Sequence, residues 1–320
     1  MHVLSSEQFT PEMLGDIFML ADEFRDEVAD PEARHELARL HEDEFLVNLF
    51  YAASTRTRLS FDFAAQRLGM NVVGTENAEQ FSSAAKGETL EHSIKVLAEY
   101  GPSVIVLRHK ATGAAVEAAE VSNVPIFNAG DGNGEHPTQA LLDAHTIYSE
   151  RQTLSGLHVV FGGDLARGRT ARSLAKVLSM YPDNRYTFTS TPELAMRADI
   201  KELLDERGVP YAESDDPEET FADADVVYWT RLQKERPLDE PGPDGQPVMI
   251  EEQDPRFILG KTALDILPED SMIMHPMPID GEIDPIVDAD PRARYFRQAG
   301  NGMYVRMALI HLVLNEAFAS

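Results

Sequence analysis

Short apolar runs alternate with segments of helical period along most of this 320-residue chain. The apolar runs are residues 45–51, 103–107, 124–128, 157–162, 185–189, 225–229 and 271–274. Helical patterns between them include Gly87–Tyr100, Thr112–Val121, Pro137–Ser149 and Thr170–Met180. A strand that is followed by a helix and then by another strand is typical of parallel sheets covered on both faces. The pattern therefore predicts doubly wound α/β structure, with functional loops at the carboxyl ends of the strands.

The pattern starts afresh at Leu157, after a helical segment that runs from Pro137 to about Glu150. The chain is long enough for two cores. Its last helical segment, Gly302–Phe318, is apolar along one face, and we expect it to return to the first unit. The predicted domains are residues 1–137 with 292–320, and residues 138–291. Pro237–Pro255, rich in Pro, Gly and Asp, indicates a mobile loop.

Composition excludes several classes of function. With no cysteine, the chain has neither disulfides nor thiolate nucleophiles nor cysteine metal ligands. A net charge of −27 argues against nucleic acid or an anionic membrane as partner. No apolar run approaches the roughly 18 residues of a membrane span, and the N-terminus lacks the features of a secretory signal, so we expect a cytoplasmic protein. Lysine occurs at only seven positions, which fits adaptation to high salt, and an acidic mesophile is the alternative.

Hydroxyl and guanidinium side chains directly follow the first apolar run, in Ser54-Thr55-Arg56-Thr57-Arg58. They precede a helix expected over Leu59–Leu68. Backbone N–H groups at a helix start carry partial positive charge, hydroxyls add neutral donors, and arginine can grip a phosphate with two parallel bonds. This segment therefore predicts an anion site in an otherwise acidic protein.

Arg108 and His136 also lie where strands are expected to end. An arginine such as Arg108 can point into the crevice above the sheet. Without the other candidates, an ordinary surface arginine at a strand end would be the better interpretation. His136 precedes Pro137, which makes it the expected N-cap of a helix whose positive end would depress its pKa. A neutral imidazole there could donate to a carbonyl oxygen, and a capping histidine without chemistry is the alternative.

In the second half, two loops carry arginine after predicted strands. The loop Gly163–Thr170 contains Arg167 and Arg169, but its glycine spacing is not the G-x-G-x-x-G of dinucleotide sites, and the arginines suit a carboxylate better. Arg231 and Gln233 alternate along an extended segment and could face one ligand. Taken singly, each of these side chains could equally be a solvated loop residue.

Two further loops complete the candidates. Ser82–Thr89 is rich in small residues and contains Lys86, which could close over an anionic ligand, whereas a flexible linker is the alternative. His275-Pro276-Met277-Pro278 follows the last apolar run. Its two prolines lack N–H groups, which leaves nearby carbonyls free to accept from an amine, and a cis bond before Pro278 is compatible with the motif.

The Ser54–Arg58 motif resembles the carbamoyl-phosphate motif of the transcarbamoylases, and later segments resemble the aspartate branch of that family, from about Phe45 to Leu314. The resemblance implies that the first domain binds carbamoyl phosphate and the second binds aspartate. It implies binding of carbamoyl phosphate by Ser54, Thr55, Arg56, Thr57, Ser82, Lys86, Arg108, His136, Gln139, Pro276 and Met277. Within that set, the implied catalytic residues are Thr57, Lys86, Arg108 and His136.

The resemblance further implies that Lys86, Arg169, Arg231 and Gln233 bind L-aspartate. Ser82 and Lys86 would come from a neighbouring subunit, so a homotrimer with shared active sites is expected. The implied reaction transfers a carbamoyl group to the aspartate amine without metal or cofactor. A regulatory or pyrimidine-pathway partner chain is left open. One departure stands out, because Ile279 occupies a position where the aspartate branch usually has Arg.

Three alternatives compete with this hypothesis. A carbamoyltransferase with another acceptor is the nearest, but the ornithine branch typically has His-Cys-Leu-Pro at 275–278 and a Ser-Met-Gly motif, which this chain lacks. A weakly active scaffold that binds carbamoyl phosphate in a pyrimidine complex is the second. An NAD-dependent dehydrogenase is disfavoured by the missing glycine fingerprint.

Overall fold

The computed structural model describes residues 1–75, 78, 87–235, 237–238 and 246–318. The chain divides into two compact units, Met1–Leu142 with Gly300–Ser320, and Asp143–Ala299. The division falls within helix α7 (Pro137–Arg151) and within helix α11 (Tyr295–Leu314), slightly C-terminal to the boundaries expected at 137 and 292.

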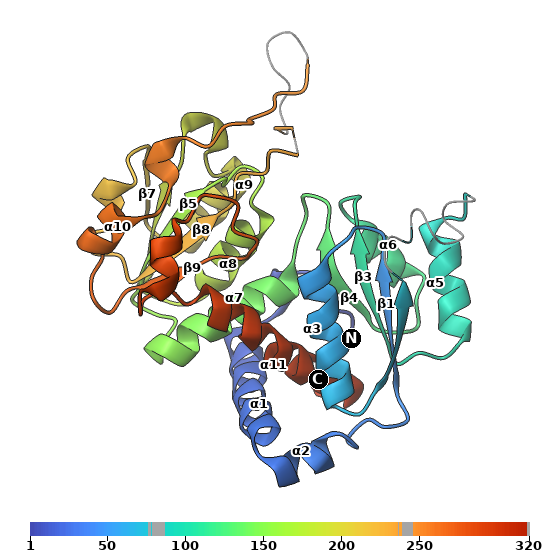
Figure 1. Cartoon of the computed structure of the whole chain (residues 1–320). Coiled ribbons are helices and arrows are strands. Elements are labelled where there is room, and N and C mark those ends of the chain that lie inside the picture. The colour runs from blue at the N-terminus through green and yellow to red at the C-terminus, as the bar shows by residue number, and fades with distance from the viewer. Residues whose placement is uncertain (76–77, 79–86, 236, 239–245, 319–320) are drawn as a thin grey trace. The chain divides into compact units, whose positions relative to one another are not determined.

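The first unit is built on a four-stranded parallel sheet (Figure 1). Its strand order is β2-β1-β3-β4. The strands are β1 (Phe45–Phe50), β2 (Asn71–Thr75), β3 (Val104–His109) and β4 (Ile126–Asp131). Because β1, β3 and β4 are parallel neighbours, their carboxyl ends meet at one edge of the sheet.

Helices cover both faces of this sheet. On one face, Phe61 of α3 (Thr55–Arg67) packs edge-on against Phe127 of β4, with ring centroids 6.3 Å apart. On the other face, the adjacent Ile126 packs with apolar residues of α5 (Leu90–Glu99) and α6 (Ala114–Glu120). Successive strand residues point to opposite faces of a sheet, which is why Ile126 and Phe127 pack against different helices.

Helices from the two ends of the chain also belong to the first unit. In its described residues they are α1 (Pro11–Ala29), α2 (Pro31–Leu37) and the part of α11 from Gly300 onward, and the first residues of α7 join them. Phe24 of α1 packs against His311 of α11, with ring centroids 5.6 Å apart. The predicted return of the C-terminal helix to the first unit is therefore confirmed.

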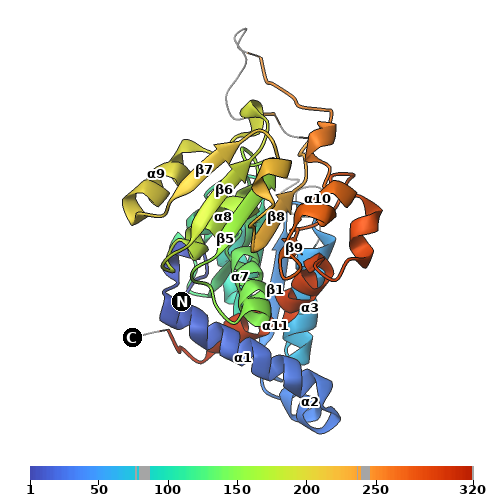
Figure 2. The same ribbon diagram turned by 90° about the vertical axis from the view of Figure 1, so that its left-hand side faces the viewer.

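The second unit holds a five-stranded parallel sheet of order β7-β6-β5-β8-β9 (Figure 2). Its strands are β5 (His158–Gly163), β6 (Arg185–Thr189), β7 (Tyr211–Ser214), β8 (Val226–Thr230) and β9 (Met272–Met274). One face packs on α8 (Arg169–Leu178), where the Tyr186 hydroxyl donates to the Ala175 carbonyl at 3.2 Å, and α9 (Ala198–Arg207) lies beside α8. The other face packs on α10 (Lys261–Ile266) through a cluster that includes Trp229.

Short 3₁₀ turns connect these elements. They are η1 (Ser6–Gln8), η3 (Pro192–Leu194), η4 (Glu218–Thr220), η5 (Pro255–Phe257) and η6 (Pro285–Ala289). The predicted mobility of Pro237–Pro255 stays a prediction, because residues 239–245 lie outside the described chain. In its described part, the Leu238 N–H donates to the Val248 carbonyl at 2.8 Å.

The predicted class, doubly wound parallel sheets with helices on both faces, is confirmed. Strands β2 and β7 were not predicted, and α3 begins at Thr55 rather than Leu59. Among the described residues, no helix combines the length and apolarity that crossing a bilayer requires.

Candidate active site

The start of α3 presents a row of donors. Ser54 is the N-cap residue, in extended conformation, and its hydroxyl makes no capping bond. Its carbonyl accepts from the Arg58 N–H at 3.1 Å, which closes the first turn. The N–H groups of residues 55–57 lie within that turn, where a helix has no carbonyl partners of its own. Thr55 and Arg56 are exposed, and no acidic residue stands in the turn. The segment is therefore suited to a solvent-accessible anion.

Arg108 lies near the carboxyl end of β3, in register with Phe50 of β1. One guanidinium nitrogen, Nη1, donates to the carbonyl of Ala129 in β4 at 2.8 Å. This bond fixes the half-buried side chain across the ends of neighbouring strands. A guanidinium carries five N–H donors, so Arg108 brings several donors to this edge.

His136 precedes α7 and is 4% exposed. Its carbonyl accepts from the N–H groups of Gln139 at 3.0 Å and Ala140 at 3.2 Å, the hydrogen bonding of an N-cap residue. The turn before it is held by the Asp131 carboxylate, which accepts from the N–H groups of Glu135 at 3.0 Å and Gly113 at 2.7 Å. The imidazole of His136 therefore follows a turn whose backbone is held by hydrogen bonds to Asp131.

The topology brings these unit-one candidates to one place. Ser54–Thr57 follow β1, Arg108 is the second-last residue of β3, and His136 and Gln139 follow β4, so all lie at the carboxyl edge of adjacent strands. Ser82 and Lys86 lie outside the described residues.

In the second unit, Arg169 is the first residue of α8. The loop before it begins at Gly163, whose φ of +92° is in the left-handed region. A Cβ at Gly163 would lie 2.2 Å from the Thr230 carbonyl oxygen, so glycine is required here by the close approach of β8 and not by a dinucleotide.

Arg167 has a structural role. Its side chain and that of Asp164 are fully buried, with Nη2 2.7 Å and Nε 2.8 Å from the same carboxylate oxygen. That oxygen also accepts from the Gln233 N–H at 3.0 Å. Of the two arginines in this loop, Arg167 binds the protein's own carboxylate, which leaves Arg169 as the candidate for a ligand. Sequence reasoning did not identify Asp164.

Arg231 and Gln233 follow β8 in an extended segment. The Arg231 guanidinium binds both oxygens of the Glu235 carboxylate, with Nη1 3.0 Å from Oε2. The hydrogen bonds that Arg231 donates to Glu235 raise its pKa above the usual value, although burial opposes this shift. Arg231 is therefore a charged donor that already binds a carboxylate of the protein, Glu235, and a substrate carboxylate at this place would have to replace it.

The last candidates, Pro276 and Met277, follow β9, and the Met277–Pro278 bond is cis, as the motif allowed. Since β5, β8 and β9 are adjacent and parallel, these residues share one sheet edge with Arg169, Arg231 and Gln233.

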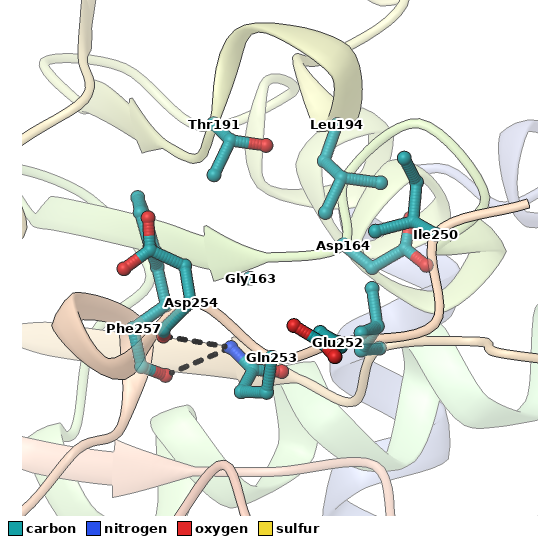
Figure 3. A pocket seen from close by; sticks show the side chains of 10 residues that line it. Gly163, Asp164, Thr191, Leu194, Ile250, Glu252, Gln253, Asp254 and Phe257 are labelled. Atoms are coloured by element: carbon teal, nitrogen blue, oxygen red, sulfur yellow. Dashed lines mark hydrogen bonds between the residues drawn. The ribbon is translucent and has the colours of Figure 1, made fainter.

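Figure 3 shows a pocket of the second unit that is lined by neighbours of these candidates, Asp164 and Leu232 among them. About 320 Å³ of empty space, part of it open solvent, lies beside Gly163, Thr191 and Phe257. Its lining includes the carboxylates of Asp164, Glu252 and Asp254, and none of Arg169, Arg231 and Gln233. Two of these carboxylates are paired with arginines of the protein, Asp164 with Arg167 and Asp254 with Arg256.

These features define a class of protein with two parallel α/β units. One unit carries hydrogen-bond donors suited to a phosphate, and the other carries arginines suited to a carboxylate. The chain belongs to the aspartate/ornithine carbamoyltransferase family. Residues 1–149 match that family's carbamoyl-P binding domain, and residues 155–313 match its Asp/Orn binding domain. The resemblance to the aspartate branch is confirmed by the relatives.

Among those relatives, the chloroplastic aspartate carbamoyltransferase of Oryza sativa is 46% identical over 98% of this chain and 84% of its own length. The aspartate carbamoyltransferase catalytic subunit of Clostridium novyi is 41% identical over 98% of this chain and 97% of its own.

Solved structures agree with this assignment. The catalytic subunit of M. jannaschii aspartate transcarbamoylase aligns with a TM-score of 0.87 and 36% identity, covering 100% of this chain and 99% of its own. The Trypanosoma cruzi enzyme in complex with carbamoyl phosphate and aspartate aligns with a TM-score of 0.84 and 33% identity, covering 97% and 95%.

Proposed function

We propose that this chain transfers the carbamoyl group of carbamoyl phosphate to the amino group of L-aspartate. The products are N-carbamoyl-L-aspartate and phosphate, in de novo pyrimidine biosynthesis. The observation that carries the proposal is the donor set at the carboxyl edge of the first sheet, where Ser54–Thr57, Arg108 and His136 come together. The names of the relatives support the choice of substrates.

The phosphate is assigned to the first turn of α3. Helix-start N–H groups, the hydroxyls of Ser54, Thr55 and Thr57, and the Arg56 guanidinium would each donate to its oxygens. Thr57, Arg108 and His136 would hold the carbamoyl oxygen, with Gln139 near the carbamoyl nitrogen. Pro276 and Met277 would accept from amine and carbamoyl N–H groups through their carbonyls.

The chemistry then needs no covalent enzyme intermediate. The neutral aspartate amine attacks the carbamoyl carbon, and the carbonyl oxygen becomes an oxyanion held by Thr57, Arg108 and His136. One good donor to such an oxyanion is worth about 3–4 kcal/mol. The C–O bond to phosphate then breaks, and the departing phosphate takes the amine proton. Arg169, Arg231 and Gln233 would bind the aspartate carboxylates and so place the amine.

Lys86 and Ser82 would complete the site from a neighbouring subunit, so we propose a homotrimer with shared active sites. We place the enzyme in the cytoplasm, whereas the plant relatives are named as chloroplastic. A separate regulatory chain is compatible with the relative from C. novyi, which is named as a catalytic subunit.

The experiment that tests this function supplies the purified chain with carbamoyl phosphate and L-aspartate and no cofactor, and measures carbamoyl-aspartate. Formation of the product at an enzymatic rate supports the proposal. Binding of carbamoyl phosphate without turnover would instead support the scaffold alternative.

A further inference from the structure

The loop after β9 is fastened at both ends by one buried pair, His275 and Glu282, each 1% exposed. Nδ1 of His275 accepts from the Met277 N–H at 2.8 Å, so the neutral ring carries its proton on Nε2. That nitrogen lies 2.7 Å from Oε1 of Glu282. The second oxygen, Oε2, accepts from the Asp280 N–H at 3.0 Å. The pair therefore holds two backbone N–H groups of the loop in fixed places.

This arrangement extends into a chain of buried polar groups in the second unit. The Gln298 side chain accepts from the His275 N–H at 2.9 Å and donates to Asp143 at 2.6 Å. The other oxygen of Asp143 accepts from the Tyr228 hydroxyl at 2.7 Å. Connected buried networks of this kind fix one arrangement of the groups they join.

The carboxylate of Glu282 is held in its charged form. Burial by itself would raise the pKa of Glu282, but hydrogen bonding with His275 and with backbone N–H groups outweighs it and lowers the pKa below its usual value. Glu282 is therefore ionised at neutral pH, and its carboxylate can accept from the Nε2–H of His275.

Apolar packing fixes the middle of the same loop. The side chains of Met277 and Ile279 pack against the cluster that contains Trp229 and Ile273. Ile279, where the aspartate branch usually has Arg, thus contributes to this apolar layer. With its ends and middle both fixed, the loop presents the carbonyls of Pro276 and Met277, to which no hydrogen bond is made within the described part of the chain.

We propose that Glu282 and His275 are positioning residues for the reaction, which set the Pro276 and Met277 carbonyls to receive N–H groups of the two substrates. The inference rests on the proposed function and deepens it. Neither side chain touches the reacting atoms. They act through the loop, so their loss should weaken amine placement while leaving phosphate binding intact.

Glu282→Gln tests this against a matched control, His158→Gln. His158 is also a buried histidine beside an acid, with Nδ1 3.0 Å from Asp223 Oδ1, but it begins β5 and so lies at the opposite edge of the sheet. We expect Glu282→Gln to raise the KM for L-aspartate about tenfold or more, with the dissociation constant for inorganic phosphate, from calorimetry, unchanged. His158→Gln should lower the Tm and leave the KM unchanged.

The double variant His275→Gln/Glu282→Gln covers the case in which the single variant fails to fold. It replaces both partners with neutral amides and leaves no unpaired buried charge. It should show the same rise in KM, because a flexible amide does not hold the Met277 N–H as the ring does.

Unchanged aspartate kinetics in either variant, or the same change in His158→Gln, would overturn the inference and leave the proposed function standing. A wild-type chain without turnover would contradict the proposed function and this inference with it.

Discussion

The backbone N–H of Gln233 donates to the Asp164 carboxylate at 3.0 Å, and the same carboxylate binds the buried Arg167. Asp164 belongs to the loop before Arg169, whereas Gln233 belongs to the loop after β8. One buried side chain therefore joins the two loops that carry the proposed aspartate ligands.

Asp164→Asn should damage both stability and substrate binding. It leaves the buried Arg167 without a full counter-charge, which typically costs about 3–5 kcal/mol. It also loosens the Gln233 loop, so we expect a higher KM for aspartate. Thermal unfolding and steady-state kinetics measure the two effects. The control is Asp199→Asn, which breaks the exposed pair with Arg197 and should cost under about 1 kcal/mol. Equal effects of both variants would contradict a special role for Asp164.

Removal of the proposed oxyanion donors should slow turnover without unfolding the chain. We predict that Arg108→Ala and His136→Ala each lower kcat by about tenfold or more, because each removes a donor to developing negative charge. The proposed trimer should survive, as judged by sedimentation. Lys110→Ala, an exposed cation just beyond β3, serves as the control and should retain kcat. Near-normal turnover in both donor variants would remove Arg108 and His136 from this role.

High salt should stabilise this protein and preserve its activity. A net charge of −27 makes the folded chain repel itself, and added ions screen that repulsion. We predict activity that holds or rises in molar KCl, measured at saturating substrates. An optimum near physiological salt, with loss of structure in molar KCl, would end the hypothesis of adaptation to high salt.

The contact between His41 and His311 predicts a pH dependence of stability in the first unit. Nε2 of His41 lies 3.1 Å from Nδ1 of His311. Burial lowers the pKa of both below 6.5, and the charge of His311 lowers that of His41 further, against an opposing effect of Glu44.

Because both folded-state pKa values are lowered, the unfolded chain binds more protons than the folded one below about pH 6.5. The free energy of unfolding should therefore fall as the pH drops through that region. Between pH 7.5 and 5.5, the Tm of His311→Gln should fall less than that of the wild type. Parallel losses in both proteins would show that the pair does not contribute.

The sequence could predict the central strands of both sheets, because a strand buried on both faces is a continuous apolar run. It missed β2 and β7, which each form one edge of a sheet, whereas the opposite edge strands, β4 and β9, are buried and were predicted. Asn71–Thr75 and Tyr211–Ser214 are short and largely exposed or half-buried, so neither has such a run. The start of α3 was placed late because its first turn, Thr55–Arg58, is polar and helical period becomes visible only at Leu59.

Candidate residues at strand ends could be predicted because parallel strands bring their carboxyl ends to one edge. The hydrogen-bond and ion-pair partners of these residues could not be predicted. Arg167 and Arg169 look alike in sequence, and only the folded turn shows that Arg167 belongs to Asp164. The spacing of His275 and Glu282 likewise gives no sign that the intervening loop folds back to join them.

The most direct test of the central claim is the ratio of kcat/KM for L-aspartate to that for L-ornithine, with carbamoyl phosphate as donor and no cofactor. We predict carbamoyl-aspartate formation with a large preference for aspartate, because the proposal assigns Arg169, Arg231 and Gln233 to the carboxylates of that substrate. A preference for ornithine, or no product from either acceptor while carbamoyl phosphate still binds, would contradict it.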